Sequence, residues 1–365
     1  MAIQAHRWLM TAVKAPLVQE AFDATPAAPG DVTVEIAGCG LCHTDLGYYY
    51  DGVRTNHPLP LALGHEIAGR VVAAGPGAES WLGKAVIVPS VMPCGECEHC
   101  MNGRLSLCIS PAVRRPASGP QRMTLGGKSM PQAGNLSSFA AHMLVHEHAV
   151  VKIRKDMPLD RAALIGCAVM TGAGAVFRTA KVEPGSTVAV IGLGGIGLSA
   201  VNAAAIAGAG RIIAIDLVGS KLNLAREFGA TDTIDAGSGE DPIKAIRSMT
   251  DGGVDYAFEC VGLKPTVEQS FRMLKRGGTA TVIGMMPIGA RFEISGAEIL
   301  GEKRIQGSAM GSNRFRIDMP RLVDYYMRGH LKLDHLISGR IRLDQINEAF
   351  RELKTGEVAR NVIAF

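Results

Sequence analysis

The segment that most constrains the fold is VAVIGLGGIGLSAV, which runs from Val188 to Val201. An apolar run leads into a glycine-rich turn and then into small residues that suit a helix, so the segment predicts a strand, a tight turn and a helix. In the G-x-G-x-x-G spacing, the first glycine permits the turn, the second lets the backbone approach a pyrophosphate, and the third allows the helix to pack closely on the strand. The cofactor-binding turn predicted here consists of Gly192, Gly194, Gly195, Ile196 and Gly197.

A second apolar strand, RIIAID, ends on Asp216, 24 residues after Gly192. A carboxylate at this place accepts hydrogen bonds from the ribose hydroxyls of NAD and repels the 2′-phosphate of NADP, so NAD is the predicted cofactor. Strands and helices alternate from Pro184 to about residue 310. This alternation predicts a doubly wound parallel sheet, and the fold class is therefore α/β.

Four cysteines lie in the single stretch CGECEHCMNGRLSLC, with C-x2-C-x2-C-x7-C spacing. Closely spaced thiolates can wrap one tetrahedral Zn²⁺, and a closed four-sulfur site leaves no position for a substrate, so this zinc is expected to be structural. The alternative is a set of buried or disulfide-bonded cysteines, which a reducing compartment disfavours. The predicted ligands are Cys94, Cys97, Cys100 and Cys108.

A catalytic metal would need other ligands, and the chain offers Cys42 in CHTD, His65 in GHE, and Cys167 in an apolar segment. Three protein ligands would leave the fourth position of a zinc ion open, as a catalytic site requires. Each residue alone would more often be a packed cysteine or a core histidine. Their coexistence with the cysteine loop and the glycine turn carries the interpretation.

Length and composition limit the remaining possibilities. With 365 residues the chain is long enough for two domains, and residues 1–168 hold seven of its eight cysteines. The net charge of +4 without a dense basic run, together with only two tryptophans, argues against a nucleic-acid partner. No signal-peptide run or stretch of about 20 apolar residues stands out, so we expect a cytoplasmic protein with no membrane partner.

The combination of CHTD, GHE, the cysteine loop, Cys167 and GLGGIG resembles the zinc-dependent medium-chain alcohol dehydrogenases nearly end to end. The resemblance implies a GroES-like β-barrel catalytic domain over residues 1–168, completed by 311–365, and a Rossmann NAD-binding domain over 169–310. It implies an oxidoreductase with two Zn²⁺ per chain that transfers a hydride between NAD and an alcohol, aldehyde or ketone. Two other classes of protein are the alternatives. Zinc-free quinone reductases share this architecture but lack both zinc sites. A zinc-stabilised dinucleotide sensor, which is not an enzyme, would not need an intact set of catalytic residues.

The resemblance also implies a role for each site residue. The catalytic zinc ligands are Cys42, His65 and Cys167, with Glu66 as a conditional ligand, Asp45 orienting His65, and Thr44 shuttling the alcohol proton. The cofactor contacts outside the glycine turn are His43 and Arg360 on the pyrophosphate, Asp216 and Lys221 on the adenosine ribose, and Thr171 behind the nicotinamide.

Two departures from the family bear on the substrate. Gly47 stands where liver-type enzymes carry a histidine that passes the proton to solvent, and Ser90 stands where they commonly carry a bulky aromatic. The extra space predicts a bulky, cyclic, benzylic or allylic alcohol, with Tyr48 and Phe139 beside the pocket. The first half is also similar to 6-hydroxycyclohex-1-ene-1-carbonyl-CoA dehydrogenases, and the second half to glutathione-dependent formaldehyde and benzyl alcohol dehydrogenases.

A CoA thioester or an S-hydroxymethyl thiol adduct is therefore an alternative substrate. The irregular loop expected over residues 109–137 contains four basic residues that could meet an anionic tail, although a solvated surface is the commoner explanation. They are Arg114, Arg115, Arg122 and Lys128.

The segment KRIQGSAMG, residues 303–311, predicts a strand at the edge of the parallel sheet. An unprotected sheet edge tends to pair with another chain. We therefore expect a two-fold homodimer, with a tetramer as the alternative.

Overall fold

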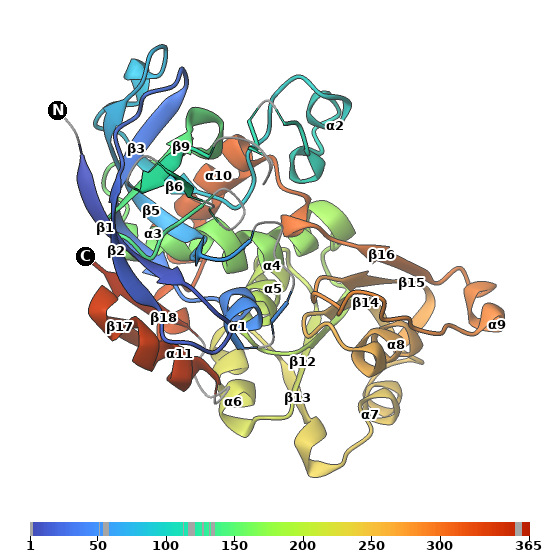
Figure 1. Ribbon diagram of the computed structural model, residues 1–365. Helices are drawn as coiled ribbons and strands as arrows, with labels where there is room; N and C mark the ends of the chain where they lie inside the picture. The colour runs from blue at the N-terminus through green and yellow to red at the C-terminus, as the bar shows by residue number, and fades with distance from the viewer. Residues whose placement is uncertain are drawn as a thin grey trace. The chain divides into compact units, whose positions relative to one another are not determined.

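The computed structural model of the protein describes residues 3–50, 52–53, 58–111, 113–115, 121–125, 128–130, 132, 136–354 and 360–365. The chain divides into two compact units (Figure 1). The first unit comprises Met1–Cys167, Arg314–Arg328 and Leu333–Phe365, and the second comprises Ala168–Asn313 and Gly329–Lys332.

The first unit is built from two mainly antiparallel sheets, with strand orders β4-β1-β2-β7-β8 and β10-β6-β5-β3-β18-β17, and β9 pairs with β3 in the second sheet. The strands expected over residues 32–39 and 67–74 are confirmed as the central antiparallel pair of that sheet. The strands are β1 Gln4–Met10, β2 Val18–Asp23, β3 Asp31–Gly40, β4 Leu61–Ala62, β5 Glu66–Ala74, β6 Ala85–Val88, β7 Met123–Leu125, β8 Lys128–Met130, β9 His142–His146, β10 Val151–Lys152, β17 Gly339–Ile341 and β18 Asn361–Ala364.

The helices of the first unit include two that the sequence predicts near the C-terminus, α10 and α11, and the final strand β18 returns to pair with β3. Apolar residues on α11, such as Phe350, pack in the same core as strands β3 and β5. The helices are α1 His43–Tyr50, α2 Glu98–Met101, α3 Leu159–Leu164, α10 Phe315–Met327 and α11 Ile346–Lys354.

The second unit contains a six-stranded sheet in the order β13-β12-β11-β14-β15-β16, and every pair in it is parallel. The predicted doubly wound sheet is confirmed, and KRIQGSAMG supplies its edge strand β16 (Figure 1). The elements are β11 Thr187–Ile191, β12 Arg211–Asp216, β13 Asp232–Asp235, β14 Val254–Glu259, β15 Leu274–Val282, β16 Arg304–Gly307, α4 Met170–Gly174, α5 Gly195–Ile206, α6 Gly219–Glu227, α7 Pro242–Met249, α8 Lys264–Arg272 and α9 Gly296–Ile299.

One helical run departs from the expectation that no segment approaches a membrane-spanning length. Residues Leu159–Ala180 form a continuous helix of 22 residues that is long and apolar enough to cross a bilayer, the one such helix in the part of the chain described. Of its apolar window, 83% is buried inside the protein. A core helix meets the same criteria of length and composition, so the helix by itself does not indicate a membrane protein.

The stretch expected to be an irregular loop, residues 109–137, contains the antiparallel strands β7 and β8, and β7 pairs with β2. Two glycines, Gly126 and Gly127, separate these strands in the sequence. Two short strands joined by Gly-Gly are a hairpin signal that the sequence interpretation overlooked.

Two of the four basic residues in this stretch bind a buried carboxylate of the first unit. The Arg122 side chain is 2% exposed and donates from Nε to Asp31 Oδ1 at 2.9 Å, and Arg115 lies 4.0 Å from the other oxygen of Asp31. Buried guanidinium and carboxylate groups are costly unless paired. Arg122 is thus committed to the fold, and Arg115 lies beside the same carboxylate with 27% of its side chain exposed.

His146 lies beside this cluster, and burial lowers its pKa to about 4, with the positive charges of His148, Arg122, Arg115 and Arg316 acting in the same direction. An unfolded histidine titrates near 6.5, so between about pH 6.5 and 4 the unfolded chain binds more protons at this residue than the native protein. The contribution of His146 to stability is therefore lost as the pH falls through that range.

We predict that His146→Asn, which can still accept the hydrogen bond from the His148 N–H, loses less thermal stability than wild type between pH 7 and pH 4.5. The difference in melting temperature should be at least about 2 °C. Melting curves across this range test it, with His330→Asn at an exposed histidine as the control. Identical pH profiles for wild type and His146→Asn would contradict the prediction.

Candidate active site and metal centres

The first candidate metal centre brings together four side chains of the first unit. Their ligand atoms all lie within 4.8 Å of one another. Cys42 immediately precedes α1, His65 and Glu66 stand at the start of β5, and Cys167 lies in the π-helical turn Ile165–Val169. Such turns occur often at functional sites. All three predicted zinc ligands and the predicted conditional ligand Glu66 are thus adjacent in space.

Asp45 ties two of these segments together. Its Oδ1 lies 3.2 Å from His65 Nδ1 and accepts the Gly64 N–H at 3.2 Å, while its Oδ2 accepts the Cys42 N–H at 3.3 Å. The Asp45 side chain is 1% exposed. A carboxylate on one ring nitrogen of a histidine fixes the ring orientation and leaves the other nitrogen for a metal.

Arg360 supplies the positive charge of this cluster. Its side chain is 3% exposed, lies 3.2 Å from Glu66 Oε1, and donates to Cys42 Sγ at 3.6 Å and to the Leu41 carbonyl at 3.3 Å. Burial raises the pKa of Glu66 to about 7, and Arg360 opposes that shift. The pKa of Cys42 is lowered well below its usual value by a hydrogen bond from Cys167, with Arg360 and His65 adding electrostatic attraction. The cluster therefore favours a thiolate at Cys42.

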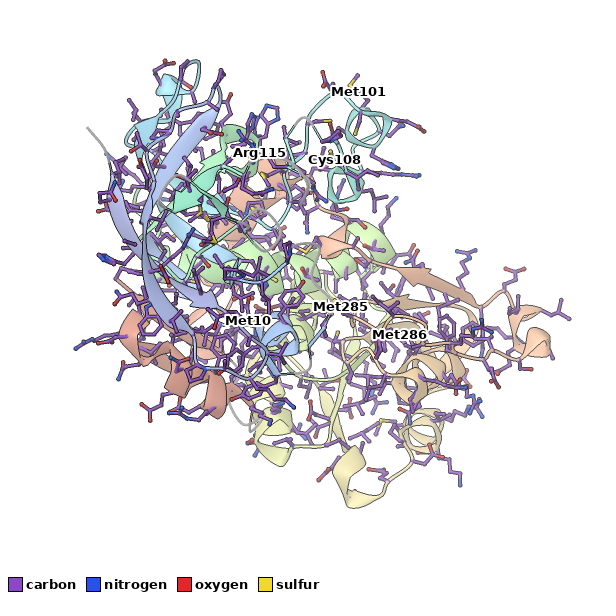
Figure 2. The ribbon with its side chains drawn as sticks, in the orientation of Figure 1. Met10, Met101, Cys108, Arg115, Met285 and Met286 are labelled. Atoms are coloured by element: carbon purple, nitrogen blue, oxygen red, sulfur yellow. The ribbon has the colours of Figure 1, made fainter. Side chains whose placement is uncertain are left out.

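The second candidate centre is the four-cysteine loop, in which Cys94, Cys97, Cys100 and Cys108 bring their sulfurs within 4.8 Å of one another. The Cys97 N–H donates to Cys94 Sγ, and the Cys94 N–H donates to Cys108 Sγ, both at 3.3 Å. Hydrogen bonds from the backbone of Glu96 and Cys97 lower the pKa of Cys94 to about 6. Figure 2 labels Cys108 and Met101 in this loop around α2. None of the eight cysteines, all of them in the described residues, forms a disulfide.

The predicted dinucleotide turn joins β11 to α5 in the second unit. Gly192 has a positive φ of 87°, and a Cβ on Gly197 would lie 1.8 Å from the Gly192 carbonyl oxygen, so neither position accepts another residue without rearrangement. A Cβ on Gly194 would meet no atom within 4 Å. Gly195 and Ile196 lie in the first turn of α5, directly after the glycine turn.

Asp216 ends β12 and organises the two loops beside it. One carboxylate oxygen accepts the Leu193 N–H at 2.7 Å, and the other accepts the Val218 N–H at 3.0 Å. Lys221 lies in the first turn of α6, and Thr171 lies in α4, where its hydroxyl is 4.0 Å from the sulfur of Met310. These cofactor candidates therefore all lie in the second unit.

The remaining site candidates belong to the first unit. His43 begins α1 and is exposed, and Thr44 and Tyr48, four residues apart, lie on the same face of that helix. Burial raises the pKa of Tyr48; the charge of His65 opposes this shift, and the charge of Asp45 adds to it.

Ser90 and Phe139 border the segment that carries His65. Ser90 follows β6, whose Val88 pairs with Ile67 of β5, and the Ser90 hydroxyl is buried with no hydrogen-bond partner among the described residues. Phe139 is fully buried and would lie 2.9 Å from a Cβ placed on Gly64. Its ring packs against Phe350 in the core.

The comparisons with known proteins agree with this arrangement. Residues 28–155 match the model of the alcohol dehydrogenase GroES-like domain, and residues 195–325 match that of the zinc-binding dehydrogenase. The probable S-(hydroxymethyl)glutathione dehydrogenase 1 of Schizosaccharomyces pombe is 37% identical over 358 residues, which cover 96% of this chain and 94% of the relative. The chain belongs to the zinc-dependent alcohol dehydrogenase family.

Solved structures of this family extend the likeness to the whole fold. An alcohol dehydrogenase zinc-binding domain protein from Burkholderia ambifaria is 34% identical with a TM-score of 0.94, and each chain covers 100% of the other. Benzyl alcohol dehydrogenase from Acinetobacter calcoaceticus is 31% identical with a TM-score of 0.92, covering 100% of this chain and 99% of its own. The predicted GroES-like barrel and Rossmann-type sheet of a zinc alcohol dehydrogenase are therefore confirmed.

Sequence reasoning missed two features of this family member. It assigned Arg360 to the cofactor alone, whereas the structure pairs its side chain with Glu66 and Cys42. It also overlooked a left-handed turn at Met310–Ser312, which contacts Thr171. The turn-forming residues in GSN, at 311–313, were the available signal for the second feature. No local signal could have indicated the first, because Arg360 and Glu66 are far apart in the chain.

We predict that Arg360→Met destabilises the zinc-loaded dehydrogenase by about 3–5 kcal/mol, because it leaves the buried Glu66 carboxylate without its cationic partner. Arg360→Met combined with Glu66→Gln should recover much of that loss. Urea unfolding of the single and double variants measures both effects. Arg154→Met, at an exposed pair with Asp156, is the control and should cost far less; an equal loss in the single and double variants would contradict the prediction.

Proposed function

We propose that this enzyme uses two Zn²⁺ per chain and NAD to interconvert an alcohol and its aldehyde or ketone. The observation that carries the proposal is the convergence of Cys42, His65 and Cys167 with Glu66 held behind them by Arg360. Two thiols and one imidazole suit zinc, and three firm ligands leave a position for substrate. A zinc-stabilised dinucleotide sensor, the non-catalytic alternative, would have no need of this open set.

When bound, zinc supplies Lewis-acid activation of the substrate oxygen, and the nicotinamide accepts or donates the hydride. The side chains of the protein orient the metal ligands and move the proton of the substrate. Asp45 fixes the His65 ring through Nδ1, and Thr44 takes the proton of the alcohol. Gly47 leaves α1 without the family's histidine for passing that proton to solvent.

The cofactor roles follow the family resemblance, and the local geometry of the glycine turn and of Asp216 supports the roles of these two features. The glycine turn and the N-terminus of α5 receive the pyrophosphate, and the resemblance assigns His43 and Arg360 to the same group. Asp216 and Lys221 bind the adenosine ribose, and Thr171 lies behind the nicotinamide. The N–H groups of Leu193 and Val218 already orient the Asp216 carboxylate.

The substrate we propose is a bulky, cyclic, benzylic or allylic alcohol. Ser90 supports this, because it stands next to the His65 segment and has a small side chain, where the resemblance to liver-type enzymes implies a bulky aromatic. S-hydroxymethyl thiol adducts are the second candidate, since the Schizosaccharomyces pombe relative is named for that activity. A CoA thioester is less favoured, because Asp31 engages Arg122 and Arg115.

We further propose a cytoplasmic two-fold homodimer joined along β16, with a tetramer as the alternative. The edge of β16 is unpaired within the described residues, and the end of α9, just before β16 in the chain, exposes large apolar side chains: Ile299 is 52% and Leu300 87% exposed. A bare sheet edge flanked by apolar residues suits pairing with a second copy. Light scattering at the mass of a monomer would contradict this assembly.

The first test separates the two metals. Cys42→Ser or His65→Ala should lower kcat at least about a thousandfold while the fold persists, because an open site serves the chemistry. Cys100→Ser should instead lower the melting temperature and the zinc content, since a closed site contributes to folding. One zinc per chain in fully active protein would refute the two-site assignment.

The second test concerns the cofactor. Replacing Asp216 with Ser or Gly removes the negative charge that opposes a 2′-phosphate, and the ratio of kcat/KM for NAD over NADP should fall about tenfold or more. Initial rates with each cofactor, followed by NADH or NADPH absorbance, measure it. Equal use of both cofactors by the wild type would contradict the proposed preference for NAD.

The third test concerns the pocket. Since each buried CH₂ contributes about 0.8 kcal/mol, wild type should prefer cyclohexanol or benzyl alcohol to ethanol in kcat/KM. Ser90→Phe should move the preference back toward ethanol, and Ser90→Ala is the size-matched control. An unchanged ranking of these alcohols in Ser90→Phe would show that Ser90 does not shape the site.

A further inference from the structure

Three successive residues after β16 adopt the left-handed backbone conformation. The φ angles are 50° at Met310, 68° at Gly311 and 51° at Ser312. Residues other than glycine seldom adopt such angles, and two of these three carry side chains. Strained backbone of this kind persists only where the surrounding structure holds it, and it gathers at functional sites.

Asn313 provides the main restraint on this turn. Its side chain is 2% exposed, and its Nδ2 group donates to the carbonyl oxygens of both Met310 and Met170 at 2.6 Å. One amide therefore joins the strained turn to α4, the helix that carries Thr171. Two glycines allow the approach: a Cβ on Gly174 would lie 2.4 Å from Asn313 Nδ2, and one on Gly311 would lie 2.3 Å from the Met170 oxygen.

A hydroxyl network connects this turn and the residue after β16 to the helical run. Thr179 Oγ1 lies 2.8 Å from Ser308 Oγ and donates to Ser312 Oγ at 2.9 Å. Ser308 comes directly after β16, and Ser312 ends the turn. Ser312, the last residue of the left-handed segment, and Ser308, which precedes that segment, are thus both attached to Thr179 in the helical run that also contains Thr171.

The turn lies at the edge of the sheet where a dinucleotide binds. Ligands of open parallel sheets bind outside the carboxyl ends of the strands, and this turn follows the carboxyl end of β16. The glycine turn follows β11, and Asp216, the proposed ribose ligand, ends β12. With the adenosine bound on the β12 side of β11, the nicotinamide half would fall on the side of β14, β15 and β16, and Met310 follows β16.

We propose that Asn313 is a positioning residue of the cofactor site, which holds the Met310–Ser312 turn against Thr171 and so shapes the contact surface for the nicotinamide ring. This rests on the proposed use of NAD. The side-chain amide of Asn313 acts through the backbone of the turn, and the Thr179 hydroxyl supports it. Loss of either should weaken binding of the nicotinamide half of the cofactor and spare the adenosine half.

The experiment compares the dissociation constants of NADH and ADP-ribose, which lacks the nicotinamide ring, for the zinc-loaded enzyme. In Asn313→Asp a carboxylate oxygen faces the two carbonyls in place of the donor, and we expect the Kd for NADH to rise about tenfold. The Kd for ADP-ribose should change less than about twofold. Thr179→Val should raise the Kd for NADH alone by about threefold.

The matched control is Asn202→Asp, at a 3% exposed asparagine of the same unit that also donates to two backbone carbonyls, those of Phe228 and His330. It should leave the ratio of the two dissociation constants at the wild-type value. Equal weakening of NADH and ADP-ribose in Asn313→Asp, or no selective effect in Thr179→Val, would overturn the proposal. Failure of the wild type to bind NADH would instead count against NAD as the cofactor.

Discussion

The candidate metal cluster of the first unit depends on placing several charges in the interior and pairing them with one another. Asp45, Glu66 and Arg360 are 1%, 0% and 2% exposed, and ionised groups removed from water are tolerated only with partners and hydrogen bonds. Arg360 reaches Glu66 and Cys42, and Asp45 reaches His65 and the backbone of Cys42. Three separate stretches of chain must converge for this balance, and two of them, together with Cys167, supply the candidate metal ligands.

The same strand pairing that forms the second sheet of the first unit also positions the side chains around the candidate metal ligands. The final strand β18 pairs with β3, and Arg360 is the residue immediately before β18. Strand β5 begins with Glu66, which lies opposite Gly40 of β3. A Cβ on Gly40 would lie 2.1 Å from Glu66 Oε2, so the glycine leaves the room that the carboxylate occupies. The sheet therefore positions both members of the ion pair through backbone pairing.

In the second unit the proposed NAD site depends instead on backbone groups that lie close together. Gly192 and Gly197 allow the turn to close against α5, and Gly174 and Gly311 allow the later turn to approach α4. Asp216 and Asn313 then hold these loops through hydrogen bonds to backbone groups. Both side chains act on loop geometry, and Gly174 and Gly311 leave the room that the Asn313 side chain occupies.

The sequence by itself determined the fold class, the four-cysteine loop, the glycine turn and the edge strand, because each depends on local spacing or on the period of apolar residues. It offered Cys42, His65 and Cys167 as candidate metal ligands only through their coexistence with those motifs and through the family resemblance. Only the tertiary structure decided that Arg360 faces Glu66, that Arg122 serves Asp31, and that Asn313 bridges Met170 and Met310. These partners lie from 3 to more than 290 residues apart, and the longer separations leave no periodic trace. Which buried charge meets which partner follows from the packing of strands and helices, and that packing is settled by the whole chain at once.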